Sequence, residues 1–216
     1  MKKTKFFKDE KYFTDSESLE NEFGIKGINF AENTSILLKG EISFSNNISF
    51  SGKNVFSNGT RVFVGAVLEN VIFGEDNKIR EYSIIKNSNF GKSNILGPFC
   101  FIRDNSFIGN NCIVGNQVEL TRSRLLNNIK ISHQAFIGDA TIADDVIVGA
   151  GVIFCNHDGN KRHKTLIEKN VLIGSGSIII SPNHIGERAI IAAGSIVTKK
   201  IKSGETYLIK NNNLVN

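Results

Sequence analysis

The residues of this chain that are best suited to chemistry gather in one short stretch. The segment FCNHDGNKRHKT, residues 154–165, holds two of the four histidines and three cationic side chains. It has no apolar residue between Cys155 and Thr165 that could fill a core. Because imidazole both binds metals and titrates near neutral pH, such a cluster raises two possibilities, a metal site and a site of proton transfer.

The cysteines argue against a structural zinc site. Cys100, Cys112 and Cys155 are odd in number and show no Cys-x-x-Cys spacing. Neither a disulfide framework nor a structural zinc site is therefore expected, and the chain suits a reducing cytoplasm.

Charge and hydropathy narrow the classes of partner. The net charge is +5, but the lysines and arginines are spread along the chain, which predicts solvated surface rather than a nucleic-acid interface. The first residues, MKKTKFFKDEKYF, lack the apolar core of a secretory signal. No run approaches the roughly 18 apolar residues of a membrane span. We expect a cytoplasmic protein without a membrane partner, which uses a few cations for small anionic ligands.

A six-residue repeat indicates which elements position the segment 154–165. Aliphatic residues recur at every sixth position on both sides of this segment. An α-helix requires a spacing near 3.6 and an ordinary strand a spacing of two, so neither explains the pattern. The clearest runs are Leu96, Ile102, Ile108, Val114 and Leu120, and then Ile167, Ile173, Ile179, Ile185, Ile191 and Val197.

A period of six is typical of a parallel β-helix. Three hexads, each a short strand and a corner, make one triangular coil of about 18 residues, stacked about 4.8 Å above the last. The fold class is therefore all-β, with roughly nine coils over residues 31–201. Residues 1–30 leave the pattern and predict an N-terminal cap, either a short helix or an irregular segment. Residues 202–216 predict a C-terminal cap or tail.

Several stretches also resemble a known family. "LGPFCFIR", "VGNQVEL", "SHQAFIGDATI", "VGAGVIFCNHDG", "HKTLI", "VLIGSGS" and "AAGSIVTK" follow one another in this order. They are similar to the C-terminal acetyltransferase domain of the bifunctional glucosamine-1-phosphate acetyltransferase/N-acetylglucosamine-1-phosphate uridyltransferase. The resemblance implies a left-handed β-helix, a homotrimer, active sites between subunits and acetyl-CoA as donor. The uridyltransferase half of the family has no counterpart in this chain.

The resemblance assigns a catalytic residue and a donor site. His133, in "SHQAF", falls where the family has its catalytic histidine, and an imidazole can accept the proton that an amine loses on attacking a thioester. Small donor-site residues would let the pantetheine arm lie along the coil. At two donor positions the residue type differs from the family: a histidine replaces Tyr, and a lysine replaces Arg. The lysine keeps the positive charge but not the bidentate hydrogen-bonding geometry of a guanidinium. The donor positions fall on Ala150, Asn156, His157, Ser175, Ala193 and Lys210.

The acceptor pocket departs from the family pattern. Arg103 matches the arginine that meets the acceptor's phosphate, and Arg162 replaces a lysine. Thr121, Phe136 and Ile147 stand where the family has Lys, Tyr and Asn. A pocket that loses polar partners leaves the groups of the same ligand unpaired. We therefore expect N-acetylation of an amino sugar or sugar phosphate, with an anionic acceptor other than glucosamine-1-phosphate.

Two other functions are weighed against this one. A β-helix that has lost catalysis could serve as a binding scaffold, which the altered acceptor residues favour. Some hexapeptide trimers are zinc carbonic anhydrases with a His-x4-His pair, whereas His157 and His163 are six apart. No metal is therefore expected.

Overall fold

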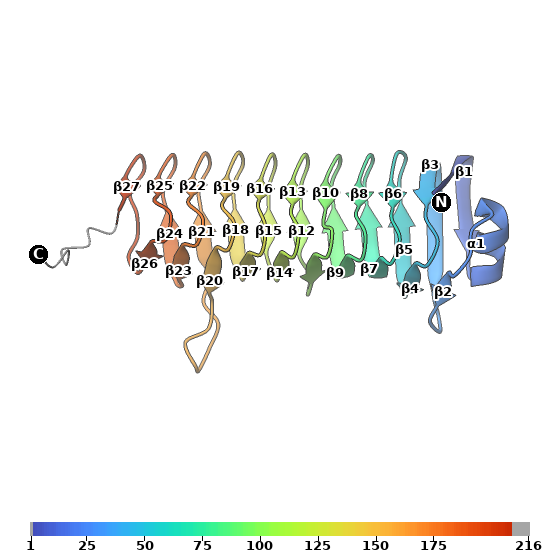
Figure 1. Cartoon of the computed structure of the whole chain (residues 1–216), viewed down its shortest axis with the longest axis horizontal. Coiled ribbons are helices and arrows are strands. Elements are labelled where there is room, and N and C mark those ends of the chain that lie inside the picture. The colour runs from blue at the N-terminus through green and yellow to red at the C-terminus, as the bar shows by residue number, and fades with distance from the viewer. Residues whose placement is uncertain (1, 209–216) are drawn as a thin grey trace, which may run out of the picture.

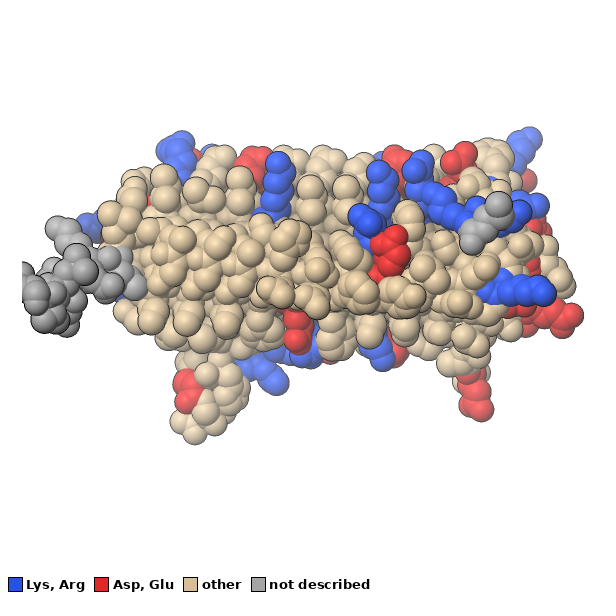
Figure 2. All heavy atoms as spheres, in the orientation of Figure 1, with Lys and Arg blue, Asp and Glu red and all other residues tan. Residues whose placement is uncertain are grey.

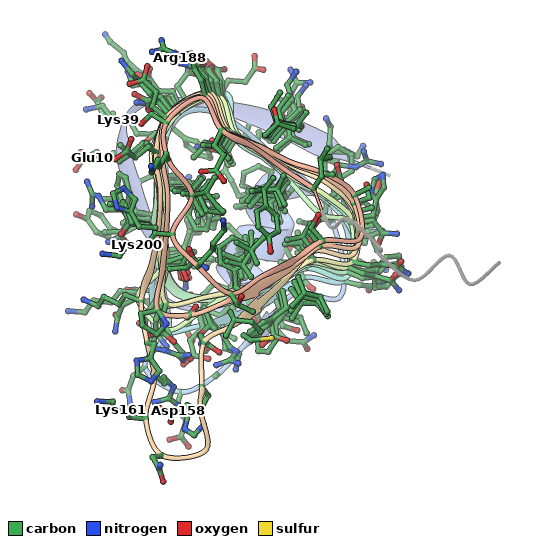
Figure 3. The ribbon with its side chains drawn as sticks, turned by 90° about the vertical axis from the view of Figure 1, so that its left-hand side faces the viewer. Glu10, Lys39, Asp158, Lys161, Arg188 and Lys200 are labelled. Carbon is green, nitrogen blue, oxygen red and sulfur yellow. The ribbon has the colours of Figure 1, made fainter. Side chains whose placement is uncertain are left out.

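The chain folds into a three-sided solenoid of short parallel strands. The computed structural model describes residues 2–208. It shows a left-handed β-helix of about ten turns, which confirms the predicted fold class and adds about one turn to the nine expected. Figure 1 shows the coils stacked along the long axis, and Figure 3 shows their triangular outline.

The strands fall into three stacked columns, one for each face. The first face holds the end of β3 (Ser35–Phe44), β6 (Arg61–Val62), β8 (Lys78–Ile79), β10 (Ile95–Leu96), β13 (Ile113–Val114), β16 (Lys130–Ile131), β19 (Ile147–Val148), β22 (Leu172–Ile173), β25 (Ile190–Ile191) and β27 (Thr206–Tyr207). The second face holds β2 (Asn29–Phe30), β4 (Ser49–Ser51), the starts of β7 (Val67–Phe73) and β9 (Ile84–Phe90), β11 (Phe101–Arg103), β14 (Glu119–Thr121), β17 (Phe136–Gly138), β20 (Ile153–Cys155), β23 (Ile178–Ile180) and β26 (Ile196–Val197).

The third face completes each coil. It holds the start of β3, β5 (Lys53–Phe56), the ends of β7 and β9, β12 (Phe107–Ile108), β15 (Arg124–Leu125), β18 (Ala140–Ile142), β21 (Thr165–Ile167) and β24 (Asn183–Ile185). We call the turns from the first to the second face the first corner, and those from the second to the third face the second corner.

The register of the strands explains the six-residue period. Ile102 pairs with Leu120, and Leu120 with Ile137, so aliphatic side chains of successive coils stack inside the solenoid. All three are fully buried. Cys100 and Cys112 occupy small inward positions, where burial raises the pKa of their thiols to about 12 and about 11.

Aromatic rings fill the N-terminal half of the core. The rings of Phe56 and Phe73 stack with centroids 5.6 Å apart, and those of Phe73 and Phe90 at 4.5 Å. Offset stacking of buried rings adds to the energy of apolar burial. The next coils continue the same inward column with aliphatic residues, beginning with Ile108 and Leu125.

The N-terminal end is closed by a strand and a helix. β1 (Lys3–Phe13) pairs antiparallel with β3, and α1 (Ser16–Phe23) lies beside it at the end of the solenoid (Figure 1). Asp15 caps the helix by accepting a hydrogen bond from the Ser18 amide. The sequence pattern predicted either a short helix or an irregular segment here, and it did not predict the strand. A register shift between Phe7 and Lys11 leaves only Phe7 and Phe13 buried, which hides the alternation typical of a strand.

Residues 156–164 leave the solenoid at the second corner and form its longest projection (Figures 1 and 3). Asp158 and Lys161 lie far from the triangular body in the view along the axis. In residues 2–208 no helix has the length and apolar character needed to cross a membrane.

Candidate functional site

The proposed catalytic residue and three of the proposed donor residues lie in one column along the first corner. Strand pairing sets the column, because Ile131, Val148, Ile173 and Ile191 are stacked in register just before it. Ala150, Ser175 and Ala193 are each followed by a glycine. The amide of that glycine donates, at 2.7 to 2.8 Å, to the carbonyl of the column residue one coil below. The column consists of His133, Ala150, Ser175 and Ala193.

The corner on the C-terminal side of His133 is built of small residues. Segments 149–152, 174–177 and 192–195 contain only glycine, alanine, serine and valine. The glycines that follow the column residues have positive φ angles of 68° to 69°, and a Cβ added to any of them would meet no atom closer than 4.0 Å. Three successive coils therefore present a smooth, uncharged strip beside His133 that an extended chain can follow.

His133 stands exposed at the N-terminal end of this strip. No hydrogen bond within residues 2–208 involves its imidazole, so both ring nitrogens are open to a ligand or to another chain. Phe136 begins β17 on the second face, and Ile147 begins β19 on the first face. Both point outward, and Ile147 is 44% exposed. The two apolar side chains therefore flank the corner that carries His133.

The other candidate residues meet at the second corner, where charges alternate along the solenoid. Arg103 is paired with Asp104, and donates to Glu119 at 2.7 Å. Arg122 donates to Asp139 through two nitrogens, at 2.8 and 3.1 Å, and to Asp104 at 3.1 Å. A two-pronged guanidinium–carboxylate contact of this kind fixes both partners in orientation.

Thr121 and Asn156 are held by this ladder of charges. The Thr121 hydroxyl is buried, donates to Asp104 at 2.9 Å and accepts from Arg122 at 2.9 Å. The Asn156 side-chain amide donates to Asp139. The side chains of both predicted site residues are therefore held in place by hydrogen bonds to the ladder.

Electrostatics strengthens the ladder. Burial raises the pKa of the Asp139 carboxyl, but the hydrogen bonds from Arg122 and Asn156 outweigh this and hold the pKa below its ordinary value. The hydrogen bond that Arg122 donates to Asp139 raises the pKa of the Arg122 guanidinium. Both groups are therefore charged across the physiological range.

The projecting loop is organised by one carboxylate. Asp158 accepts from the amides of Asn160 at 2.8 Å and Lys161 at 2.9 Å, and pairs with the His163 ring at 2.6 Å. These contacts, the one to His163 foremost, hold the pKa of Asp158 well below its usual range. The loop is thus held by its own hydrogen bonds. Arg162 is exposed on it, and so is His157, whose Nδ1 accepts from the Gly159 amide at 3.0 Å.

A hollow of about 280 Å³ lies next to the second corner, on the third face. Arg122, Arg124 and Lys164 line it together with Asp139. Arg124 also lies over the Phe107 ring, 4.3 Å from its centroid. The cations around this corner outnumber the carboxylate in the hollow, which makes the region suitable for a small anion.

Within one chain the candidate residues form two separate groups. The first corner has His133, and the second corner has Asn156 one coil further along. A full face separates the two corners, and because a strand advances about 3.3 Å per residue, the separation is on the order of 15 Å. The first group is His133, Phe136, Ile147, Ala150, Ser175 and Ala193, and the second is Arg103, Thr121, Asn156, His157 and Arg162. Lys210 lies outside the described residues.

Further residues of the second corner were not identified from the sequence. Asp104, Arg122 and Asp139 are members of the ladder, and Asp158 orders the loop. Gly138 leaves room for the Asn156 side chain, because a Cβ at position 138 would lie 2.4 Å from the amide nitrogen of Asn156. The contacts of Arg122 with Asp139 and Asp104 join residues 17 and 18 apart, so only the coil register reveals them. In residues 2–208, no three His, Cys, Asp or Glu side chains gather as metal ligands would.

Comparison with known sequences agrees with the repeat pattern. A family described as the hexapeptide repeat of succinyl-transferase matches residues 164–199. The bifunctional protein GlmU of Baumannia cicadellinicola subsp. Homalodisca coagulata is 38% identical over 188 residues, which is 84% of this chain and 40% of that protein. GlmU of Acidithiobacillus ferrooxidans is 36% identical over 83% of this chain and 41% of its own length.

The chain thus spans about 40% of the length of the curated relatives it matches. Among solved structures, LpxA from Acinetobacter baumannii superposes with a TM-score of 0.53 at 13% identity, over 82% of this chain and 65% of that one. This likeness shows the fold alone. The resemblance stated from the sequence motifs is confirmed over most of the chain.

Proposed function

Since the chain is a hexapeptide-repeat protein similar over most of its length to part of GlmU, we propose that it is an acetyl-CoA-dependent N-acetyltransferase. Its acceptor would be an amino sugar or a sugar phosphate. The observation that carries this proposal is the column of His133, Ala150, Ser175 and Ala193, in which a general base stands at the end of a smooth strip.

The strip suits the donor. Side chains no larger than serine at Ala150, Ser175 and Ala193 leave room for the pantetheine arm along three coils. Its thioester would then lie at the N-terminal end of the strip, next to His133. The strip has no charged residue, which suits the neutral amides of the arm rather than its phosphates.

The chemistry follows from that placement. The acceptor amine attacks the thioester carbonyl carbon, so a C–N bond forms and the C–S bond breaks. His133 takes the proton that the amine loses and returns it to the departing sulfur, so that CoA leaves as the thiol. Asn156 and nearby backbone amides would hold the thioester and its developing oxyanion.

We infer the charge of the acceptor from the cationic side chains that are not already paired with a carboxylate. Arg162 is exposed on the loop and forms no ion pair within the described residues, so it can attract a phosphate. Arg103 is already neutralised by Asp104 and Glu119, so we assign it an orienting contribution more than a charge. Thr121, Phe136 and Ile147 supply less polarity than the family's Lys, Tyr and Asn, and this favours a less polar acceptor.

A complete site requires two chains. His133 and Asn156 lie at opposite edges of one face, so a single chain cannot present both to one thioester. We propose a homotrimer in which the first corner of one subunit meets the second corner and projecting loop of the next. Closed symmetry then repeats the same site at each interface.

A thiol-release assay tests the function. Purified protein is mixed with acetyl-CoA and a panel of amino sugars and amino sugar phosphates, and free CoA is measured. We expect His133→Ala to lower the rate by at least about 100-fold with an unchanged circular dichroism spectrum. His184→Ala is the matched control, because His184 pairs with Glu168 on the third face at 2.7 Å.

Full transfer by His133→Ala would contradict the mechanism. Tight binding of acceptor sugars without CoA release by the wild-type chain would instead favour a binding scaffold, the function that the altered acceptor positions support.

A further inference from the structure

We propose that the first corner continues, on the N-terminal side of His133, as a subsite for a second sugar ring of the acceptor. The inference rests on the proposed function, and it names the acceptor class as an amino oligosaccharide rather than a monosaccharide. The subsite consists of Gln134, Gln117, Phe99 and Tyr82, which we call the amide–aromatic strip.

The amide–aromatic strip lies in register with the column of His133. Each of its members directly follows the column position of its coil, which is His133 in the coil of Gln134. Their amides donate to the carbonyl of the column residue one coil below, at 2.9 to 3.2 Å. Gln134 donates its side-chain amide to Gln117 at 3.2 Å. The rings of Phe99 and Tyr82 stack at 5.4 Å with an interplanar angle of 8°.

The strip keeps large side chains where the backbone favours glycine. All four residues have positive φ angles, from 54° for Tyr82 to 56° for Phe99 and Gln134. On the donor side of His133 the same position is glycine in three successive coils. A bulky residue at positive φ is strained, so the retained rings call for a role of their own. Both rings are 53% exposed, so core packing does not supply that role.

The chemistry of the strip fits a neutral sugar. Aromatic faces pack against the apolar faces of a pyranose, and side-chain amides both donate and accept hydrogen bonds with hydroxyl groups. The corner segments 97–100, 115–118 and 132–135 contain no charged residue, and the corner of Tyr82 has Arg80 and Glu81, which pair with each other at 3.0 Å. An uncharged band runs along the middle of the face shown in Figure 2, over the coils of β10 to β25.

The distances fit a ring beyond the one that reacts. Coils repeat about every 4.8 Å, so Gln117 lies one step from His133, and Phe99 and Tyr82 lie about 10 and 14 Å away along the axis. The reacting amino sugar would occupy the coil of His133. The next ring of the acceptor would lie beside Gln117 and contact Phe99, whose ring is supported by stacking on Tyr82.

Binding without the donor tests the subsite independently of catalysis. Titration calorimetry compares glucosamine with its β-1,4-linked disaccharide on the wild-type protein. We expect the disaccharide to bind about tenfold more tightly. Phe99→Gly and Tyr82→Gly should abolish this preference while the melting temperature stays the same or rises, because glycine relieves the strained φ. Tyr12→Ala is the control, since Tyr12 is an exposed ring on β1 in the cap.

The outcomes are distinct. Equal binding of the two sugars by the wild-type protein, or a preference that survives both glycine variants, overturns the subsite. A change of oligomeric mass in the glycine variants with the sugar preference intact assigns the rings to a contact between copies and also overturns it. Loss of CoA release in the thiol assay, with disaccharide binding retained, would count against the proposed function and leave the subsite supported.

Discussion

At the residue scale, the position of Asn156 depends on the absence of a side chain one coil below. Gly138 has ordinary φ, so alanine suits its backbone, and the obstacle is the Asn156 amide 2.4 Å from the added Cβ. Asn156 cannot move aside freely because its amide donates to Asp139, which Arg122 holds through two hydrogen bonds. The glycine thus serves the site and not the turn.

Gly138→Ala should therefore lower acetyl transfer by about tenfold or more and the free energy of unfolding by about 1–3 kcal/mol. The rate is read from thiol release and the stability from urea unfolding.

The double variant Gly138→Ala, Asn156→Ala separates this cause from a general effect. Removing the Asn156 amide removes the clash, so the two stability losses should not add. Additive losses would show that Gly138 is required for another reason.

At the element scale, the projecting loop depends on Asp158. Its carboxylate bonds two backbone amides and the His163 ring, all outside the core (Figure 3). Asp158→Ala should release the loop and lower transfer, with the melting temperature within about 1 °C of the wild type because no core contact is lost. Amide hydrogen exchange at residues 160 and 161 provides the measurement. Asp158→Asn, which keeps an acceptor oxygen, should retain part of the protection, and full protection in Asp158→Ala would contradict the assignment.

Loop order should also depend on pH in a definite direction. The pKa of Asp158 is lowered in the folded chain, so the charged form is the one that the loop stabilises. The contribution is complete above the ordinary aspartate pKa of about 4 and is lost as the pH falls through the lowered value. Backbone order parameters of residues 160 and 161 should stay constant from pH 7 to about pH 4 and decrease only in stronger acid. Loss of order near neutral pH would contradict this account.

At the scale of the whole molecule, the proposed site joins the first corner of one subunit to the second corner of the next, because the two corners of one chain lie on the order of 15 Å apart. This predicts complementation between two inactive variants, His133→Ala and Asn156→Ala, when both are expressed together. In the proposed trimer, each mixed assembly would have one interface that joins an intact first corner to an intact second corner. Random assembly should then recover about a quarter of wild-type activity.

Native mass spectrometry of the co-expressed chains establishes that mixed trimers form, and thiol release gives the activity. Each variant purified alone is the control. Mixed trimers without activity would place the complete site within one chain.

The sequence alone determined the solenoid. Ile167, Ile173 and Ile179 belong to a local repeat, and every coil has the same geometry. A period of six therefore predicts the faces, the corners and the aliphatic interior. It also marked the interruption at residues 154–165 and, through family motifs, the column of His133. The cap was less readable, because the bulge in β1 breaks its alternation.

Only the tertiary structure decided how the site is divided. Asp104 lies 18 residues before Arg122 and Asp139 lies 17 residues after it, and no local pattern marks the three as neighbours. The amide–aromatic strip is hidden for the same reason, since Tyr82, Phe99 and Gln117 meet only when coils stack. A six-residue repeat fixes which side chains point inward, whereas the outward chemistry depends on the register of one coil upon the next.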